Sequence, residues 1–157
     1  MVKKVRIYVR SVQRITLPQA DDESIFEEIF EPEPAVTVVQ SEGELEYEDG
    51  VVTITYEESE VTGMENCITS LTFSDTEPDR VSLYRSGPVK TALMFCEGQR
   101  YISVYDTGYG SFEVGICTEK CKNEIDTDGG ELHISYSVEI RGSQAEHTEL
   151  EMKVRNV

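Results

Sequence analysis

The chain has 157 residues, of which 38% are hydrophobic and 29% charged, and its formal net charge at pH 7 is −17. These proportions are typical of globular proteins and predict a single domain over residues 1–157 with a hydrophobic core of its own. An acidic surface repels phosphate groups, so the composition argues against nucleic-acid and membrane partners. Because the sequence shows neither a run of about eighteen apolar residues nor a signal-peptide pattern, we expect a cytoplasmic protein.

The N-terminal segment carries five of the fourteen basic residues within its first fourteen positions. Apolar and charged residues alternate from Lys3 to Leu17, which predicts a half-buried strand that ends at Pro18. We expect its basic side chains to pair with acidic neighbours, and nucleic-acid binding by this strand is the less favoured alternative. Residues 19–34 are acidic and contain Pro32 and Pro34. They are predicted to form an insertion, either a short helix over one end of the sheet or an irregular loop.

The next two strands, Ala35–Glu48 and Val51–Ser59, flank Asp49-Gly50, a dipeptide that favours the positive φ angles of a tight hairpin. Short turns separate the further strands predicted at Asn66–Ser74, Val81–Arg85, Val89–Cys96, Tyr101–Thr107, Ser111–Cys121, Glu131–Arg141 and His147–Val157. About ten such strands in an open sheet would leave two unpaired edges. The sequence therefore predicts an all-β fold, an up-and-down antiparallel meander closed into a barrel of eight to ten strands.

Several segments resemble a known family when they are taken in order along the chain. They are YEE (Tyr56–Glu58), TGM (Thr62–Met64), LYRSGPVK (Leu83–Lys90), YDTGYGSFEVGICT (Tyr105–Thr118) and GGELHISYS (Gly129–Ser137). In these segments the chain is similar to the YwiB-type family of small bacterial proteins of unknown function. The resemblance implies a calycin-like, that is lipocalin-like, barrel and a bacterial cytoplasmic setting. It implies no activity, ligand or catalytic residue.

Two charged residues are predicted to point into the barrel, since Arg85 and Glu58 each lie on the apolar face of their strand. A buried charge without a partner costs several kcal/mol, so the two should pair with each other or with the hydroxyls of Tyr56, Tyr105 and Thr107. Three interpretations stay open. The group closes one barrel end as a satisfied network, or Arg85 receives the acid group of a small ligand, or a shift of register exposes all five residues.

The function hypothesis is a non-enzymatic barrel that binds a small, anionic ligand near Arg85. The alternative is a protein interaction module or a homodimer that uses the outer face of the sheet. Whether the protein is an enzyme is left uncertain, because catalysis would depend on Glu58 and Arg85 alone. No cofactor or metal is expected, since the two histidines, His133 and His147, lie on polar strand faces.

The four cysteines lie on predicted strands, and a cytoplasmic protein is expected to keep them as free thiols. Cys117 and Cys121 are four positions apart, which places them on the same face of a regular strand. They would then be separated by roughly 13 Å, too far for a disulfide.

Overall fold

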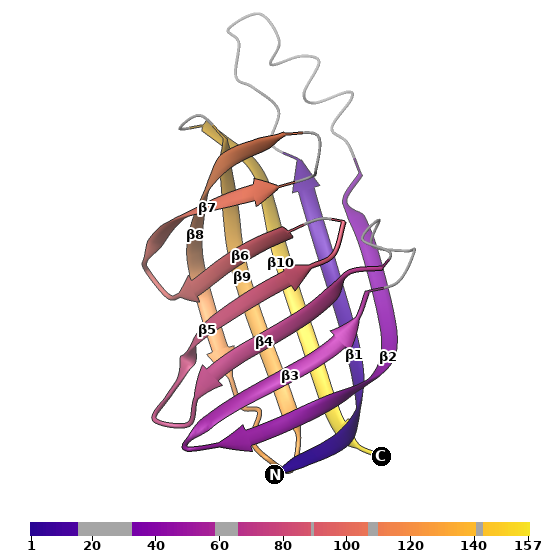
Figure 1. The fold of residues 1–157 in the computed structure, drawn as a ribbon. Coiled ribbons are helices and arrows are strands. Elements are labelled where there is room, and N and C mark those ends of the chain that lie inside the picture. The colour runs from indigo at the N-terminus through magenta and orange to yellow at the C-terminus, as the bar shows by residue number, and fades with distance from the viewer. Residues whose placement is uncertain (16–32, 59–65, 89, 107–109, 141–142) are drawn as a thin grey trace, which may run out of the picture.

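The computed structural model describes residues 1–15, 33–58, 66–88, 90–106, 110–140 and 143–157. Its strands are β1 (Val2–Ile15), β2 (Ala35–Glu48), β3 (Val51–Glu57), β4 (Ile68–Ser74), β5 (Glu77–Ser86), β6 (Lys90–Cys96), β7 (Arg100–Asp106), β8 (Ser111–Asn123), β9 (Gly130–Ile140) and β10 (Ser143–Asn156). Each strand pairs with the next in antiparallel fashion, and β10 pairs with β1, so the sheet closes into a barrel (Figure 1). The predicted meander and its closure are confirmed.

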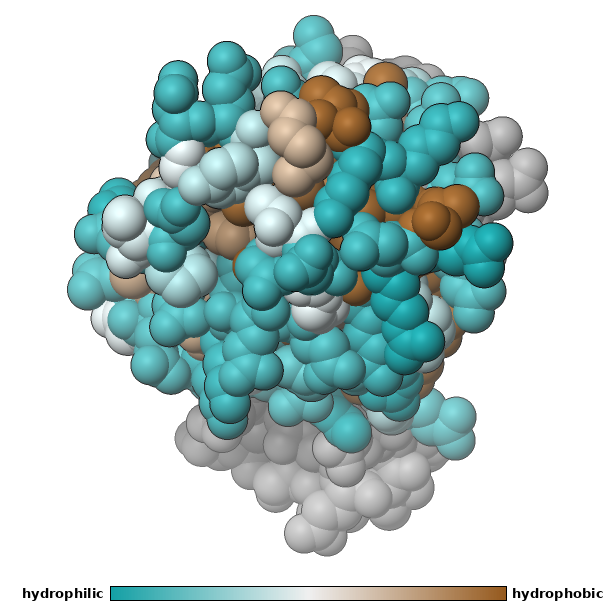
Figure 2. All heavy atoms as spheres, turned by 90° about the horizontal axis from the view of Figure 1, so that it is seen from below, coloured by the Kyte–Doolittle hydropathy of each residue, from teal (hydrophilic) through white to brown (hydrophobic). Residues whose placement is uncertain are grey.

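The barrel has two walls of different strand direction (Figure 1). Strands β3 to β7 cross the front at a slant, and we call them the front wall. Strands β9, β10 and β1 run steeply behind them. Both termini lie at the lower end, which is covered largely by hydrophilic side chains in Figure 2. In the described part of the chain no helix is long and apolar enough to cross a membrane.

Alternate side chains of every strand point inward and build one hydrophobic core. Its fully buried members include Leu45, Ile54, Leu71, Phe95, Leu132 and Met152, each from a different strand. Burial of one such side chain stabilises the fold by about 1.5–3 kcal/mol. The core therefore provides a rigid frame for the polar residues that share the barrel interior.

Two glycines allow the chain to turn where the barrel requires it. Asp49 and Gly50 have φ angles of 52° and 81°, so the predicted hairpin turn between β2 and β3 is present. Gly43 on β2 is paired with β1 on one side and is the residue at which the pairing with β3 begins on the other. An added Cβ at Gly43 would meet the backbone carbonyl of Thr55, so the close approach of the two strands requires glycine.

A register shift in β8, between Thr118 and Lys120, corrects one prediction about the cysteines. Cys117 is half-buried and donates a hydrogen bond to Glu139, whereas Cys121 is buried in the hydrophobic core. The two therefore do not share a face, because an extra residue in a strand reverses the orientation of the positions that follow. All four cysteines are free thiols.

The seam between β6 and β7 has the shortest ladder of the barrel. In the described ranges, the register joins these strands only at Lys90–Asp106 and Thr91–Tyr105. Beyond that point the hydroxyl of Ser103 donates a hydrogen bond to the carbonyl oxygen of Ala92. The backbone connection of this seam thus lies at the level of Thr91 and Tyr105, which belong to the candidate site.

Candidate functional site

A row of polar side chains crosses the inner face of the front wall, one residue from each strand. Tyr56, Thr69, Arg85, Thr91 and Tyr105 are successive register partners on β3 to β7. All five are buried or half-buried. On β3 to β6 the next inward row contains only aliphatic residues, Ile54, Leu71, Leu83 and Leu93, so the polar row lies directly on the hydrophobic core.

Glu58 is the centre of a buried ion pair at one end of this row. Its side chain is 2% exposed and that of Arg85 is 15% exposed, and Arg85 Nε lies 3.5 Å from Glu58 Oε1. The hydroxyl of Thr69 donates a hydrogen bond of 2.6 Å to the same oxygen. A carboxylate with a guanidinium and a hydroxyl donor beside it can stay ionised in a protein interior.

Tyr56 lies beside this ion pair, and its surroundings favour the neutral form of its hydroxyl. Burial is the main cause that raises the pKa of its hydroxyl well above the ordinary value of 10.0, and the neighbouring Glu58 carboxylate raises it further. The positive charge of Arg85 acts in the opposite direction and is the weaker influence. Tyr56 therefore serves the carboxylate as a neutral polar neighbour at physiological pH.

A cavity of about 390 Å³ opens beside Arg85, and its lining includes Ser11 and Gln13 near the end of β1. Its polar lining includes Arg85, Tyr105, Tyr136, Glu146 and Thr148. Its apolar lining consists of Leu93, Val114, Ile116, Val138, Ile140 and Leu150. A concave space with apolar walls and a few convergent polar groups is the usual form of a small-molecule site.

Tyr136 and Glu146 face Arg85 from the rear of this cavity. Glu146 accepts a hydrogen bond of 2.8 Å from the Thr148 hydroxyl. Burial raises the pKa of Tyr136 to about 12, with smaller contributions from Tyr105 and Glu146, while the charge of Arg85 lowers it. The cavity thus presents a guanidinium on one side and a carboxylate on the other.

The Thr91 hydroxyl is the unsatisfied member of the polar row. It is buried between Arg85 and Tyr105, and no hydrogen-bond partner for it occurs among the described residues. A buried polar group without a partner costs about 1–3 kcal/mol. Thr91 is therefore a position where an apolar residue of the same shape should be tolerated.

The predicted site residues are not all in one place. The structure brings Tyr56, Glu58 and Arg85 together, and Tyr105 lines the cavity with Arg85. Thr107 lies outside the described residues, as does most of the predicted insertion 19–34. That these residues bind a ligand stays a prediction.

The sequence interpretation missed several residues of the polar row and the cavity, among them Thr69, Thr91, Tyr136, Glu146 and Thr148. Thr69 and Tyr136 each stand on the apolar face of a strand, which could have indicated them. Glu146 shares the face of Leu150 and Met152 by alternation, but the last predicted strand begins one residue later, at His147.

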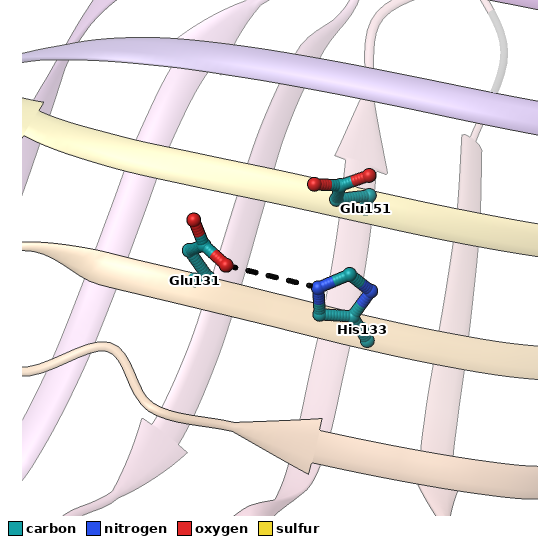
Figure 3. Close-up of side chains that lie close together, drawn as sticks. All are labelled: Glu131, His133 and Glu151. Carbon is teal, nitrogen blue, oxygen red and sulfur yellow. Dashed lines mark ion pairs between the residues drawn. The ribbon is translucent and has the colours of Figure 1, made fainter.

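A second cluster of ionisable residues lies on the outer face of β9 and β10 (Figure 3). It consists of Glu131, His133 and Glu151, whose candidate ligand atoms lie within 4.8 Å of one another. His133 Nε2 lies 3.9 Å from Glu131 Oε2. The ammonium of Lys153, however, lies 3.9 Å from one carboxylate and 3.5 Å from the other. Because this lysine already supplies the positive charge, we interpret the cluster as an ion network between strands.

The raised pKa of Tyr136 leads to a testable pH dependence. Because the unfolded chain loses this proton near the ordinary value of 10.0, the stabilising effect is complete below that pH and is lost as the pH rises toward about 12. Alkaline titration by tyrosinate absorbance should show a late-ionising tyrosine that Tyr136→Phe removes. Ionisation of all eight tyrosines near pH 10 in the folded protein would contradict this.

Comparison with known proteins agrees with the barrel fold. No curated protein matches the chain. The structure resembles the crystal structure of the ywiB protein from Bacillus subtilis with a TM-score of 0.76 and 18% sequence identity, over 99% of this chain and 93% of that chain. This likeness shows a common fold. Residues 27–152 match the family described as "Domain of unknown function (DUF1934)". The predicted resemblance to YwiB-type proteins is thereby confirmed, and the chain belongs to the DUF1934 family.

Proposed function

We propose that this barrel binds a small molecule with a carboxylate or phosphate group in the cavity beside Arg85. The observation that carries the proposal is the way Arg85 is held. Glu58 engages its Nε atom at 3.5 Å, and within the described ranges no ion pair or hydrogen bond involves the two terminal nitrogens. Those nitrogens form the fork that binds planar acid groups in two parallel hydrogen bonds.

The rest of the cavity lining narrows the chemistry of the ligand. Its aliphatic wall suits a hydrocarbon or ring portion, and Glu146 can accept a hydrogen bond from a hydroxyl or amino group. Because Glu58 already neutralises Arg85, charge alone would attract an anion only weakly. We therefore propose a ligand that gains affinity from apolar contact and from geometry together with its acid group.

The proposal concerns binding and not catalysis. A hydrolytic or transfer reaction would need a nucleophile beside a positioned base. In the described part of the lining, the polar groups are hydroxyls, one amide, one guanidinium and one carboxylate, and they include neither a histidine nor a cysteine. The hydroxyl that lies beside the carboxylate, that of Thr148, belongs to a residue that is only 1% exposed.

Calorimetric titration with octanoate and with inorganic phosphate tests the proposal, and octanamide serves as the uncharged control. Octanoate should bind more tightly than octanamide. The double variant Glu58→Gln/Arg85→Met, which removes both charges, should weaken octanoate roughly 10- to 100-fold, the value of one charge-assisted contact. The affinity of the double variant for octanamide should be nearly that of the wild type.

Thr91→Val is the matched control, since it alters the same row without touching the guanidinium. Its affinity for octanoate should stay within about twofold of the wild type. Equal affinities of the wild type and the double variant for octanoate would refute the role of Arg85. Binding of neither octanoate nor phosphate at millimolar concentration would count against the ligand class.

A further inference from the structure

The middle of the outer face of the front wall carries no charged side chain, in a protein whose net charge is −17. Its outward positions on β3, β4 and β5 carry hydroxyl side chains at Thr53, Thr55, Ser70, Thr72 and Ser82. Charged residues border this middle region: Glu57 ends β3, and Arg80 on β5 lies beside Cys96, the last residue of β6. We call this surface the front face.

Apolar side chains continue the front face across β5, β6 and β7. They are Tyr84, Ala92, Met94, Ile102 and Val104. Tyr84, Ile102 and Val104 are each more than half exposed, at 52%, 55% and 52%. The outer face of β1 and β10 differs completely, since charged residues such as Arg6, Glu151 and Lys153 recur along it. Absence of charge combined with exposed aromatic and aliphatic groups is the composition of an interface core.

The hydroxyls of the front face satisfy one another. Thr53 and Thr72 are 3.5 Å apart at their hydroxyl oxygens, and Thr55 and Ser70 are 3.3 Å apart. The Ser82 hydroxyl donates to the sulfur of Met94 at 3.4 Å. Burying this face against a partner would therefore leave few polar groups without a hydrogen bond, which keeps the desolvation cost low.

We infer that two copies of the chain associate through their front faces. A charged partner would find counter-charges only at the border of the front face, whereas a second copy presents the same pattern of hydroxyl and apolar groups. Two-fold symmetry brings equivalent residues near the axis into mutual contact. For two molecules of this net charge, the uncharged face is also the side on which close approach causes least repulsion.

The area of the front face determines how tightly two copies are expected to bind each other. Five strands about 4.8 Å apart, with seven residues at about 3.3 Å each, give a face of roughly 24 by 23 Å, on the order of 550 Å². Stable complexes bury about 800 Å² per partner, and smaller interfaces belong to weak associations. We therefore expect a dimer with a dissociation constant on the order of 10 µM.

Sedimentation equilibrium of the full chain at low and high salt tests the inference. The dimer should form at tens of micromolar, and the dimer fraction should increase with salt because screening relieves repulsion between the two acidic bodies. Tyr84→Lys, near the centre of the face, should raise the dissociation constant more than tenfold. Val38→Lys on β2 makes the same change of charge at a residue that is 41% exposed and lies off the front face, and it should have no such effect.

Each other outcome contradicts the inference. A chain that stays monomeric at both salt concentrations, even if it captures a different protein, does not use this face for a second copy. A dimer that tolerates Tyr84→Lys, or one that weakens with salt, forms through another surface. Circular dichroism of both lysine variants confirms that the barrel is intact.

Discussion

Replacement of Phe95 by alanine is expected to lower the free energy of unfolding by about 3–5 kcal/mol, the usual cost of removing a buried aromatic ring. Phe95 is fully buried, and its ring contacts that of Tyr136 with 4.8 Å between centroids and 51° between planes. The expected cost combines the lost hydrophobic burial of the ring with the cost of the cavity left in the core. Urea denaturation followed by circular dichroism measures it.

Met94→Ala is the matched control on the same strand, because Met94 points outward and is only half-buried. Its cost should stay below about 1 kcal/mol. Phe95→Ala should also bring the pKa of Tyr136 down from about 12, since removal of the ring in contact with it makes Tyr136 less buried. A loss below 1 kcal/mol in Phe95→Ala would show that the core repacks around the gap.

Much of the fold could be predicted because the side chains of a barrel strand alternate between the inner and the outer face, with a period of two residues. The bounds predicted for β2, Ala35–Glu48, are those of the structure, and the turn at Asp49-Gly50 has the backbone that its residues favour. Closure followed from the need to hide two sheet edges. These inferences depend only on local pattern and on the chemistry of turns.

Only one property of the site could be predicted, namely which side chains point inward according to the alternation along a single strand. The inward direction of Glu58 and Arg85 follows from alternation within β3 and β5. The neighbours of Arg85 in the polar row depend on cross-strand register, which a single strand does not encode. The register shift in β8 defeats even the rule of alternation, and so Cys117 was misplaced relative to Cys121. Glu146 was missed for another reason, because the last predicted strand begins at His147.

The front wall connects the two proposals of ligand binding and self-association. Tyr84 and Arg85 are consecutive on β5, so one lies on the front face and the other lines the cavity. A wall that is covered by a second copy from outside would hold its inner row more firmly. The Tyr84→Lys variant therefore allows octanoate affinity to be compared between monomer and dimer with the cavity residues unchanged.

The two partners of the buried ion pair are expected to differ sharply in their effect on stability. Arg85→Met should cost about 3–5 kcal/mol, because it leaves an ionised Glu58 carboxylate that is 2% exposed and has, among the described residues, the neutral hydroxyls of Thr69 and Tyr56 but no positive charge beside it. Glu58→Gln should cost only about 1–2 kcal/mol, since the amide still accepts from Thr69 and the 15% exposed Arg85 reaches the cavity.

Urea denaturation of the two single variants and of Glu58→Gln/Arg85→Met completes the test as a double-mutant cycle. The double variant should recover most of the stability that Arg85→Met loses, because replacing both charges of a buried pair is close to neutral. If Glu58→Gln proved the more costly change, the guanidinium would be the less solvated partner. If the double variant lost the sum of both single effects, the two side chains would not interact, and Arg85 would owe its inward position to packing alone.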